Sequence, residues 1–111
     1  MVEYALSLDN IFASLADPTR RDILRRVADS ELSVGELAKS YDLTFSAVSK
    51  HLKVLEKASL IIKRRRGKEQ MVSLAPEALA NALEYLNWYS QFIGARYDSL
   101  EIYINKEVTH E

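Results

Sequence analysis

The sequence predicts one mainly α-helical domain that contains a single small β-hairpin. Apolar residues recur every three or four positions over most of the chain, which is the spacing that places them on one face of a helix. Only 3 glycines and 2 prolines interrupt this pattern. Residues 60–74 differ, because β-branched residues flank turn-forming residues there. The length of 111 residues suits one domain spanning residues 1–111.

Two short helices are expected in the first thirty residues. Residues 7–15 show an apolar stripe at helical spacing. Asp17 is then placed to cap a second helix, with Pro18 at the first helical position, where the missing N–H costs nothing. This second helix is expected to continue to about Ala28.

Residues 33–57 predict a helix, a short turn and another helix. Ser33 and Glu36 stand at the spacing of a capping box, in which each side chain binds the backbone N–H of the other residue. Thr44 is placed to cap the second helix of this pair. A helix, a short turn and a helix form the DNA-binding helix-turn-helix unit. The apolar residues of the second helix step by four and three, at Val48, Leu52 and Leu55.

The opposite side of this second helix is small, polar and cationic. An α-helix fits the major groove of DNA, and its exposed side chains near the N-terminus reach the base edges. His51 has an alternative role in packing, because it follows Val48 by three positions and lies partly beneath the helix. The residues predicted to contact DNA are Thr44, Ser46, Ala47, Ser49, Lys50, His51 and Lys53.

Residues 60–74 predict two strands joined by a turn at residues 66–69. A hairpin directly after such a helix is a wing, so the fold class is a winged helix-turn-helix with the order α-α-α-α-β-β-α. The basic side chains of the wing are predicted to bind phosphates, and a solvated charged hairpin is the alternative. These side chains are Arg64, Arg65, Arg66 and Lys68.

The distribution of charge supports a polyanion-binding surface. The net charge is -1, yet residues 44–74 contain 8 basic and 2 acidic side chains, and both flanking segments are net acidic. Such asymmetry is typical of a nucleic-acid-binding face. A second arginine group has two alternative roles, DNA contact or ion pairing with Asp17, Asp22 and Asp29. Its members are Arg20, Arg21, Arg25 and Arg26.

Residues 76–105 predict a final helix with an interruption at Ser90 and a bend or break at Gly94. Its apolar residues cover more than one face, and thirty residues would extend about 45 Å, which is longer than a domain of this size covers. The excess apolar surface indicates a second copy of the chain, so residues 7–15 and 76–105 are expected to form dimerisation helices. A ligand pocket between the subunits is the alternative. The predicted interface residues are Leu8, Ile11, Phe12, Leu86, Tyr89, Phe92, Ile93, Tyr97 and Leu100.

Several other function classes have little support in the sequence. The absence of cysteine excludes disulfides and thiolate metal sites. Ser46, Ser49 and His51 lie too close together on one helix to form a catalytic triad, and no glycine-rich phosphate loop is present, so no enzyme, cofactor or metal is expected. The sequence shows no secretion signal and no apolar run of about 18 residues, so a cytoplasmic protein without membrane contact is expected.

Two alternatives to a DNA-binding regulator stay open. One is a winged helix that contacts proteins and has lost DNA binding, although such a module has no need for the concentrated positive charge. The other is a sensor that binds metal without cysteine, through a group of ligands in the last residues. That group consists of Glu107, His110 and Glu111.

The chain resembles the ArsR (ArsR/SmtB) family of bacterial winged-helix repressors. Three blocks in this order and spacing make the resemblance specific over residues 11–74, whereas the final helix matches in character only. The blocks read LADPTRRDIL at residues 15–24, ELSVGELA at residues 31–38 and SAVSKHLKVL at residues 46–55.

The resemblance implies a homodimer joined through its first and last helices, which binds an inverted-repeat operator and represses until a signal relieves it. Family members that sense metal use cysteines at positions that match Ser33 and Gly35, so that sensory site is missing here. Ser59 stands where the family usually has glycine after the recognition helix, and that corner is expected to differ. Phe45 occupies a place that is often polar.

Overall fold

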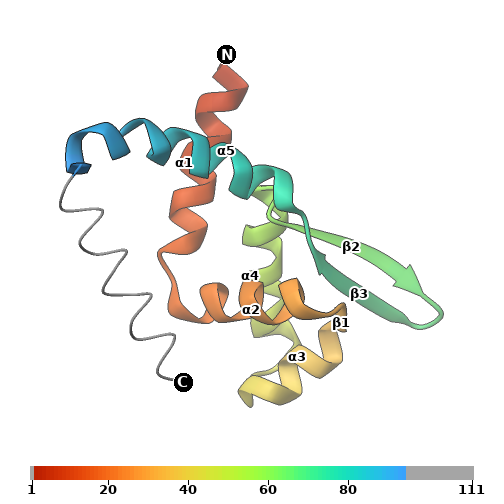
Figure 1. Cartoon of the computed structure of the whole chain (residues 1–111). Helices are drawn as coiled ribbons and strands as arrows, with labels where there is room; N and C mark the ends of the chain where they lie inside the picture. Colours follow the sequence, from red (N-terminus) through yellow and green to blue (C-terminus); the bar gives the residue numbers. More distant parts are fainter. Residues whose placement is uncertain (1, 95–111) are drawn as a thin grey trace.

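The structure, a computed structural model, describes residues 2–94 as a helical body from which a β-hairpin projects (Figure 1). The winged helix-turn-helix that the sequence predicts is confirmed. Three of its helices precede the recognition-type helix, and one follows the wing. The elements are α1 (Val2–Leu15), α2 (Pro18–Asp29), β1 (Leu32–Ser33), α3 (Val34–Tyr41), α4 (Phe45–Lys57), β2 (Ile61–Arg66), β3 (Glu69–Leu74) and α5 (Pro76–Trp88).

The three predicted helix starts are capped as expected. The Asp17 side chain accepts a hydrogen bond from the Arg20 N–H at 3.0 Å and begins α2. The capping box of α3 is complete, because Ser33 Oγ accepts from the Glu36 N–H at 3.0 Å and Glu36 Oε1 accepts from the Ser33 N–H at 2.8 Å. Thr44 accepts from the Ala47 N–H at 3.0 Å and begins α4. Short-range sequence signals therefore fix where these helices begin.

The sheet has three strands rather than the predicted two. Its order is β1-β3-β2, and all pairs are antiparallel. Strand β1 consists of two residues, which pair with Val72 and Met71 of β3. A strand of this length shows no alternation of apolar and polar residues, so the sequence pattern did not reveal it. The wing itself extends from the Ile61–Leu74 pair to the Arg66–Glu69 pair.

One core connects α1, α2, α3, α4 and the base of the wing. The apolar stripe of α4 lies within it, as predicted. Ile11 is fully buried in the same core, so its assignment to a dimer interface was wrong: no part of this side chain is available to a second chain. The fully buried apolar side chains include Ile11, Ile23, Leu37, Val48, Leu52, Leu55, Leu60 and Val72.

The described part of the predicted final helix is interrupted close to Ser90, where the sequence placed an interruption. Helix α5 ends at Trp88, and residues 90–94 are helical again. At the break, the side chains of Ser90 and Gln91 donate to the carbonyls of Asn87 and Trp88, so local side-chain bonds replace the regular helix pattern. The rest of the predicted helix, with Tyr97 and Leu100, lies outside the described residues. Helix α1 begins at Val2 rather than at residue 7.

No helix among residues 2–94 has the length and apolar character needed to cross a membrane.

Ser59 adopts the left-handed backbone conformation that the family's glycine would take. Its φ is 61°, and its N–H binds the Glu56 carbonyl at 2.9 Å. The next N–H, of Leu60, binds the Leu55 carbonyl at 3.0 Å, which completes a Schellman motif. Leu55 and Leu60 are both fully buried. The corner is therefore built in the ordinary way, at the cost of placing a serine in a strained conformation.

Replacing Ser59 with glycine should stabilise the protein. The side chain is exposed, and a left-handed conformation costs an L-residue about 1 kcal/mol, part of which the more flexible unfolded glycine chain cancels. We expect Ser59→Gly to raise the free energy of unfolding by about 0.5 kcal/mol in urea denaturation. Ser30→Gly is the control, because Ser30 has φ -159° and gains nothing from glycine. Equal effects of both variants would contradict the explanation.

Candidate nucleic-acid interface

Helix α4 presents a polar face to solvent because its apolar face is held in the core. Ser46, Lys50 and Lys53 are exposed, and Ala47 and Ser49 are half-buried. Thr44 is exposed at the start of the helix, where its hydroxyl caps the backbone. The side chains of residues 44–53 that were predicted to contact DNA, apart from His51, are thus at least partly accessible to solvent.

His51 is half-buried and faces α2. Its Nδ1 lies 3.4 Å from Arg20 Nη1 and 3.9 Å from Asp17 Oδ2. The hydrogen bond from the Arg20 backbone N–H, with electrostatic contributions from the neighbouring His51 and Arg20 side chains, holds the pKa of Asp17 below its ordinary value. The ring therefore joins α4 to the start of α2, which is the packing role weighed for it in the sequence.

Arg20 has a structural role that the sequence did not reveal. Its Nε donates to the Ser14 carbonyl at 2.8 Å, and its Nη2 donates to the Ala13 carbonyl at 3.2 Å. These carbonyls lie in the last turn of α1, where the regular helix bonds end. The guanidinium binds both of them, beside the Ala16 N–H that also binds the Ala13 carbonyl, and complements the negative end of the helix. No sequence pattern predicts this contact, because it depends on how α2 folds back on α1.

Arg21 and Arg26 of α2 bind within the body as well. Arg21 donates to the Leu15 carbonyl at 2.8 Å. Arg26 forms the expected kind of ion pair with Asp22, at 3.4 Å, and its guanidinium lies 5.2 Å from the centre of the Tyr41 ring. Tyr41 donates to Asp22 at 2.5 Å, and burial, followed by this bond, raises the pKa of Tyr41 to about 12.

The four wing side chains that were predicted to bind phosphates divide into two groups. Arg64 and Arg66 form ion pairs with Glu31, at 2.7 Å and 2.9 Å. Hydrogen bonding to Arg64, with the charges of both arginines, lowers the pKa of Glu31. Arg65 and Lys68 instead line a pocket between the wing and the helix-turn-helix.

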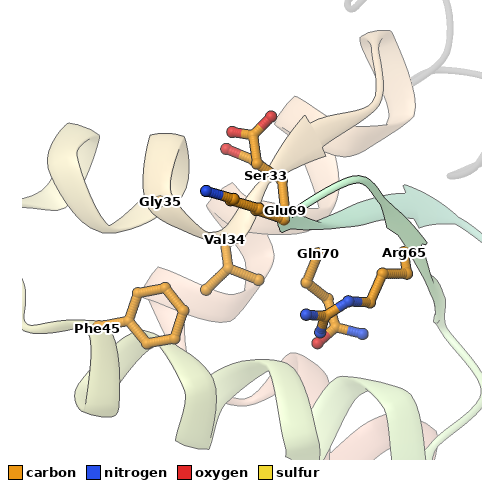
Figure 2. Close-up of a pocket in the computed structure, with 8 residues that line it drawn as sticks. Ser33, Val34, Gly35, Phe45, Arg65, Glu69 and Gln70 are labelled. Carbon is orange, nitrogen blue, oxygen red and sulfur yellow. The ribbon is translucent and has the colours of Figure 1, made fainter.

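This pocket joins the wing to the beginnings of α3 and α4 (Figure 2). Its volume is about 320 Å³. Phe45, the first residue of α4, lines it and is 61% exposed, which is unusual for so large an apolar side chain. The resemblance marked Phe45 as a departure, but it was not among the predicted contact residues. The lining residues are Ser33, Val34, Gly35, Phe45, Arg65, Lys68, Glu69 and Gln70.

A second surface, on α1 and α5 and the residues after α5, is apolar and exposed. Phe12 of α1 meets Tyr85 of α5 edge to face, with ring centres 6.0 Å apart. The row continues along α5, where the Tyr85 and Tyr89 rings are 5.4 Å apart and their hydroxyls are 3.0 Å apart. Leu8 is half-buried against the core. The exposed members are Phe12, Leu83, Tyr85, Leu86, Trp88, Tyr89, Phe92 and Ile93.

The non-cysteine metal group considered in the sequence, Glu107 with His110 and Glu111, lies outside the described residues.

These features define a DNA-binding winged helix-turn-helix regulator. The model of the family described as bacterial regulatory protein, arsR family, matches residues 17–63. The HTH-type transcriptional regulator Rv2034 of Mycobacterium tuberculosis is 45% identical over 74 residues, which cover 67% of this chain and 69% of the relative. The transcriptional repressor SdpR of Bacillus subtilis is 30% identical over 86 residues, which cover 78% and 92%. The chain belongs to the ArsR family of transcriptional regulators.

Solved structures agree with this assignment. An ArsR family transcriptional regulator, RHA00566, superposes with a TM-score of 0.75 at 29% identity, over 83% of this chain and 95% of that one. A homodimeric winged helix-turn-helix DNA-binding domain from Mycobacterium bovis, Mb0332, has the same fold, with a TM-score of 0.65 at 23% identity over 83% and 87%.

Loss of the Arg20 guanidinium should destabilise the fold. Arg20→Ala removes the side-chain donor of the Ser14 carbonyl and leaves the Ala13 carbonyl with the Ala16 N–H alone, which should cost about 1–2 kcal/mol of unfolding free energy. Arg25→Ala removes an exposed arginine from the same helix and should change stability by less than about 0.5 kcal/mol. Urea denaturation of both variants measures the difference. Equal stabilities would show that the hydrogen bonds of Arg20 add nothing to the stability of the fold.

Proposed function

We propose that the chain is a homodimeric repressor that binds an inverted-repeat operator in double-stranded DNA. Helix α4 enters the major groove, and the wing contacts the flanking phosphates. The observation that supports this most is the shared pocket, because it sets Phe45 at the start of α4 beside Arg65 and Lys68 of the wing. One duplex can then touch both elements at once. A signal that the chain does not identify relieves repression.

Within this proposal the side chains of α4 have different tasks. Ser46, Ser49 and Lys50 reach base edges, and Lys50 suits the acceptors of guanine. Lys53 lies a turn further along the helix and meets a phosphate, which positions the helix without reading sequence. Phe45 is exposed at the helix start, where an apolar side chain suits contact with a thymine methyl group.

The dimer is proposed from the apolar surface of α1 and α5. Exposed aromatic and aliphatic side chains gather there, and such patches on a domain mark contact surfaces. The similar mycobacterial domain is described as homodimeric. A two-fold axis would place two copies of α4 in successive major grooves about 34 Å apart, so the target is an imperfect palindrome. The proposed interface residues are Leu8, Phe12, Leu86, Tyr89, Phe92 and Ile93.

Selection of bound fragments from random DNA tests the function as a whole. The proposal expects the recovered sequences to share two inverted half-sites whose centres are about one helical turn, or about 10 base pairs, apart. Each recovered duplex should bind two chains. Recovery of no common motif from a folded dimer would contradict sequence-specific binding and favour the protein-contact alternative.

Lys50 and Lys53 should differ in what they contribute to binding. Lys50→Ala should relax the base preference at one position of each half-site, at about 1–3 kcal/mol of discrimination. Lys53→Ala should weaken binding to all sequences alike and lower the slope of log K against log salt by about 0.9 for each phosphate that the protein no longer neutralises. Fluorescence anisotropy over a salt series, with matched and mismatched duplexes, measures both effects. Identical behaviour of the two variants would contradict the division.

The dimer should separate when a charge enters the apolar surface. Leu86 is 50% exposed, and Leu86→Asp should yield a monomer that binds the operator at least about 100-fold more weakly, because two half-sites no longer act together. Sedimentation velocity gives the mass, and anisotropy gives the affinity. Ile62→Asp is the control for the mass alone, since Ile62 is similarly exposed, at 52%, but lies on β2 of the wing, and it should stay dimeric. A dimeric Leu86→Asp protein would refute this interface.

A further inference from the structure

One carboxylate holds two arginines of the wing. Glu31 immediately precedes β1, and Arg64 donates to it through Nε at 2.7 Å and through Nη2 at 2.9 Å. Arg66 donates to the same carboxylate through Nη2 at 2.9 Å. Glu31 thus accepts three charged hydrogen bonds across the width of the sheet, from the edge formed by β1 to the edge formed by β2. The predicted site did not include Glu31.

The alternation of the strand separates these arginines from Arg65. Side chains at successive positions of a strand point to opposite faces, so Arg64 and Arg66 share one face and Arg65 lies on the other. Arg65 and its strand partner Gln70 line the pocket shared with the helix-turn-helix (Figure 2). The wing therefore has one face whose arginines are already paired with Glu31 and one face that offers Arg65 toward the reading helix.

The wing needs such a restraint because its tip extends beyond the third strand. Strand β1 pairs with β3 only at Val72 and Met71, whereas β2 and β3 continue together as far as the Arg66–Glu69 pair. Arg66 belongs to this two-stranded end, and Glu31 lies immediately before β1, beside the three-stranded part. Their ion pair therefore crosses from the body to the tip.

We propose that Glu31 is a positioning residue for DNA binding, because its carboxylate ties Arg64 and Arg66 to the body and so orients the wing with Arg65 and Lys68 toward the DNA. This inference rests on the proposed function. An isolated surface ion pair contributes little, but here one carboxylate with 21% side-chain exposure serves two arginines, one of them bidentate. The Glu31 side chain is ordered once for both ion pairs, so the entropy cost per ion pair is lower than for two separate pairs.

Replacing Glu31 distinguishes a positioning role from a purely electrostatic one, because the two roles predict different changes in DNA affinity. Glu31→Ala deletes a negative charge beside the proposed DNA surface, so charge alone predicts tighter binding and a steeper salt dependence. A positioning role instead predicts weaker binding. We expect operator binding to weaken about 3- to 10-fold, with the salt slope unchanged because Arg65 and Lys68 still meet phosphates. Asp29→Ala is the control, since it removes an exposed acid two residues earlier, and it should bind as tightly as the unaltered protein or slightly more tightly.

Hydrogen exchange in the absence of DNA supplies a second measurement. Loss of the ion pair between Glu31 and Arg66 should accelerate exchange of the wing-tip amides at residues 65–70, both in Glu31→Ala and in Arg66→Ala. The double variant should exchange no faster than Glu31→Ala alone, because Glu31→Ala already breaks the ion pair that Arg66→Ala removes. Arg65→Ala should leave this exchange unchanged but weaken DNA binding and lower the salt slope.

Each outcome of these experiments decides between the proposals. Equal or tighter DNA binding by Glu31→Ala would overturn the positioning role, and so would unchanged exchange at the wing tip. If the unaltered protein selects no DNA while Glu31→Ala still accelerates exchange, the tie exists but the proposed function has failed. Circular dichroism melts of all variants check that each one is folded.

Discussion

The burial of one side of α4 is the constraint on which the other features depend. Val48, Leu52 and Leu55 are fully buried, so rotation of the helix about its axis would expose them to water. Burying three such side chains is worth several kcal/mol, which is comparable with the whole stability of a small domain. With that side fixed, Lys50 and Lys53 have no position other than the solvent face. The reading surface is thus a consequence of core packing.

The position of the wing is set relative to α4. The Schellman motif at Ser59 ends α4 and turns the chain into β2, so the wing begins at a fixed distance from the recognition residues. Lys63 of β2 lies 3.2 Å from Glu56 of α4, which joins the base of the wing to the helix end. Glu31 performs the corresponding task nearer the tip. The basic side chains of the wing thus form two groups: those paired with acidic side chains of the protein, and those that face outward.

The sequence predicted those features that short-range signals encode. The caps at Asp17, Ser33 and Thr44 each depend on residues within three positions, and the apolar stripe of α4 repeats within one helix. The contacts of Arg20 and Glu31 were missed because they join residues that only the folded chain brings together. Ile11 was misassigned for a related reason: an apolar stripe shows which side of a helix is buried, but not whether the same chain or a second chain covers it.

A further difference comes from a feature too small to produce a pattern. Strand β1 has only two residues, and its pairing with β3 depends on the position of the wing. The break after α5 was within reach of the sequence, because the apolar periodicity is interrupted at Ser90. In the structure α5 ends at Trp88, and the side chains of Ser90 and Gln91 bind carbonyls at this break.

A titration of isotope-labelled protein with its selected duplex, followed by backbone amide NMR, tests the central claim most directly. The account places DNA against the outward side of α4 and the pocket-facing side of the wing. The amide signals of residues 44–53 and 64–68 should shift or broaden most, while those of α2 and α5 should change little. Changes centred on α2 or α5, with α4 and the wing unaffected, would contradict the account.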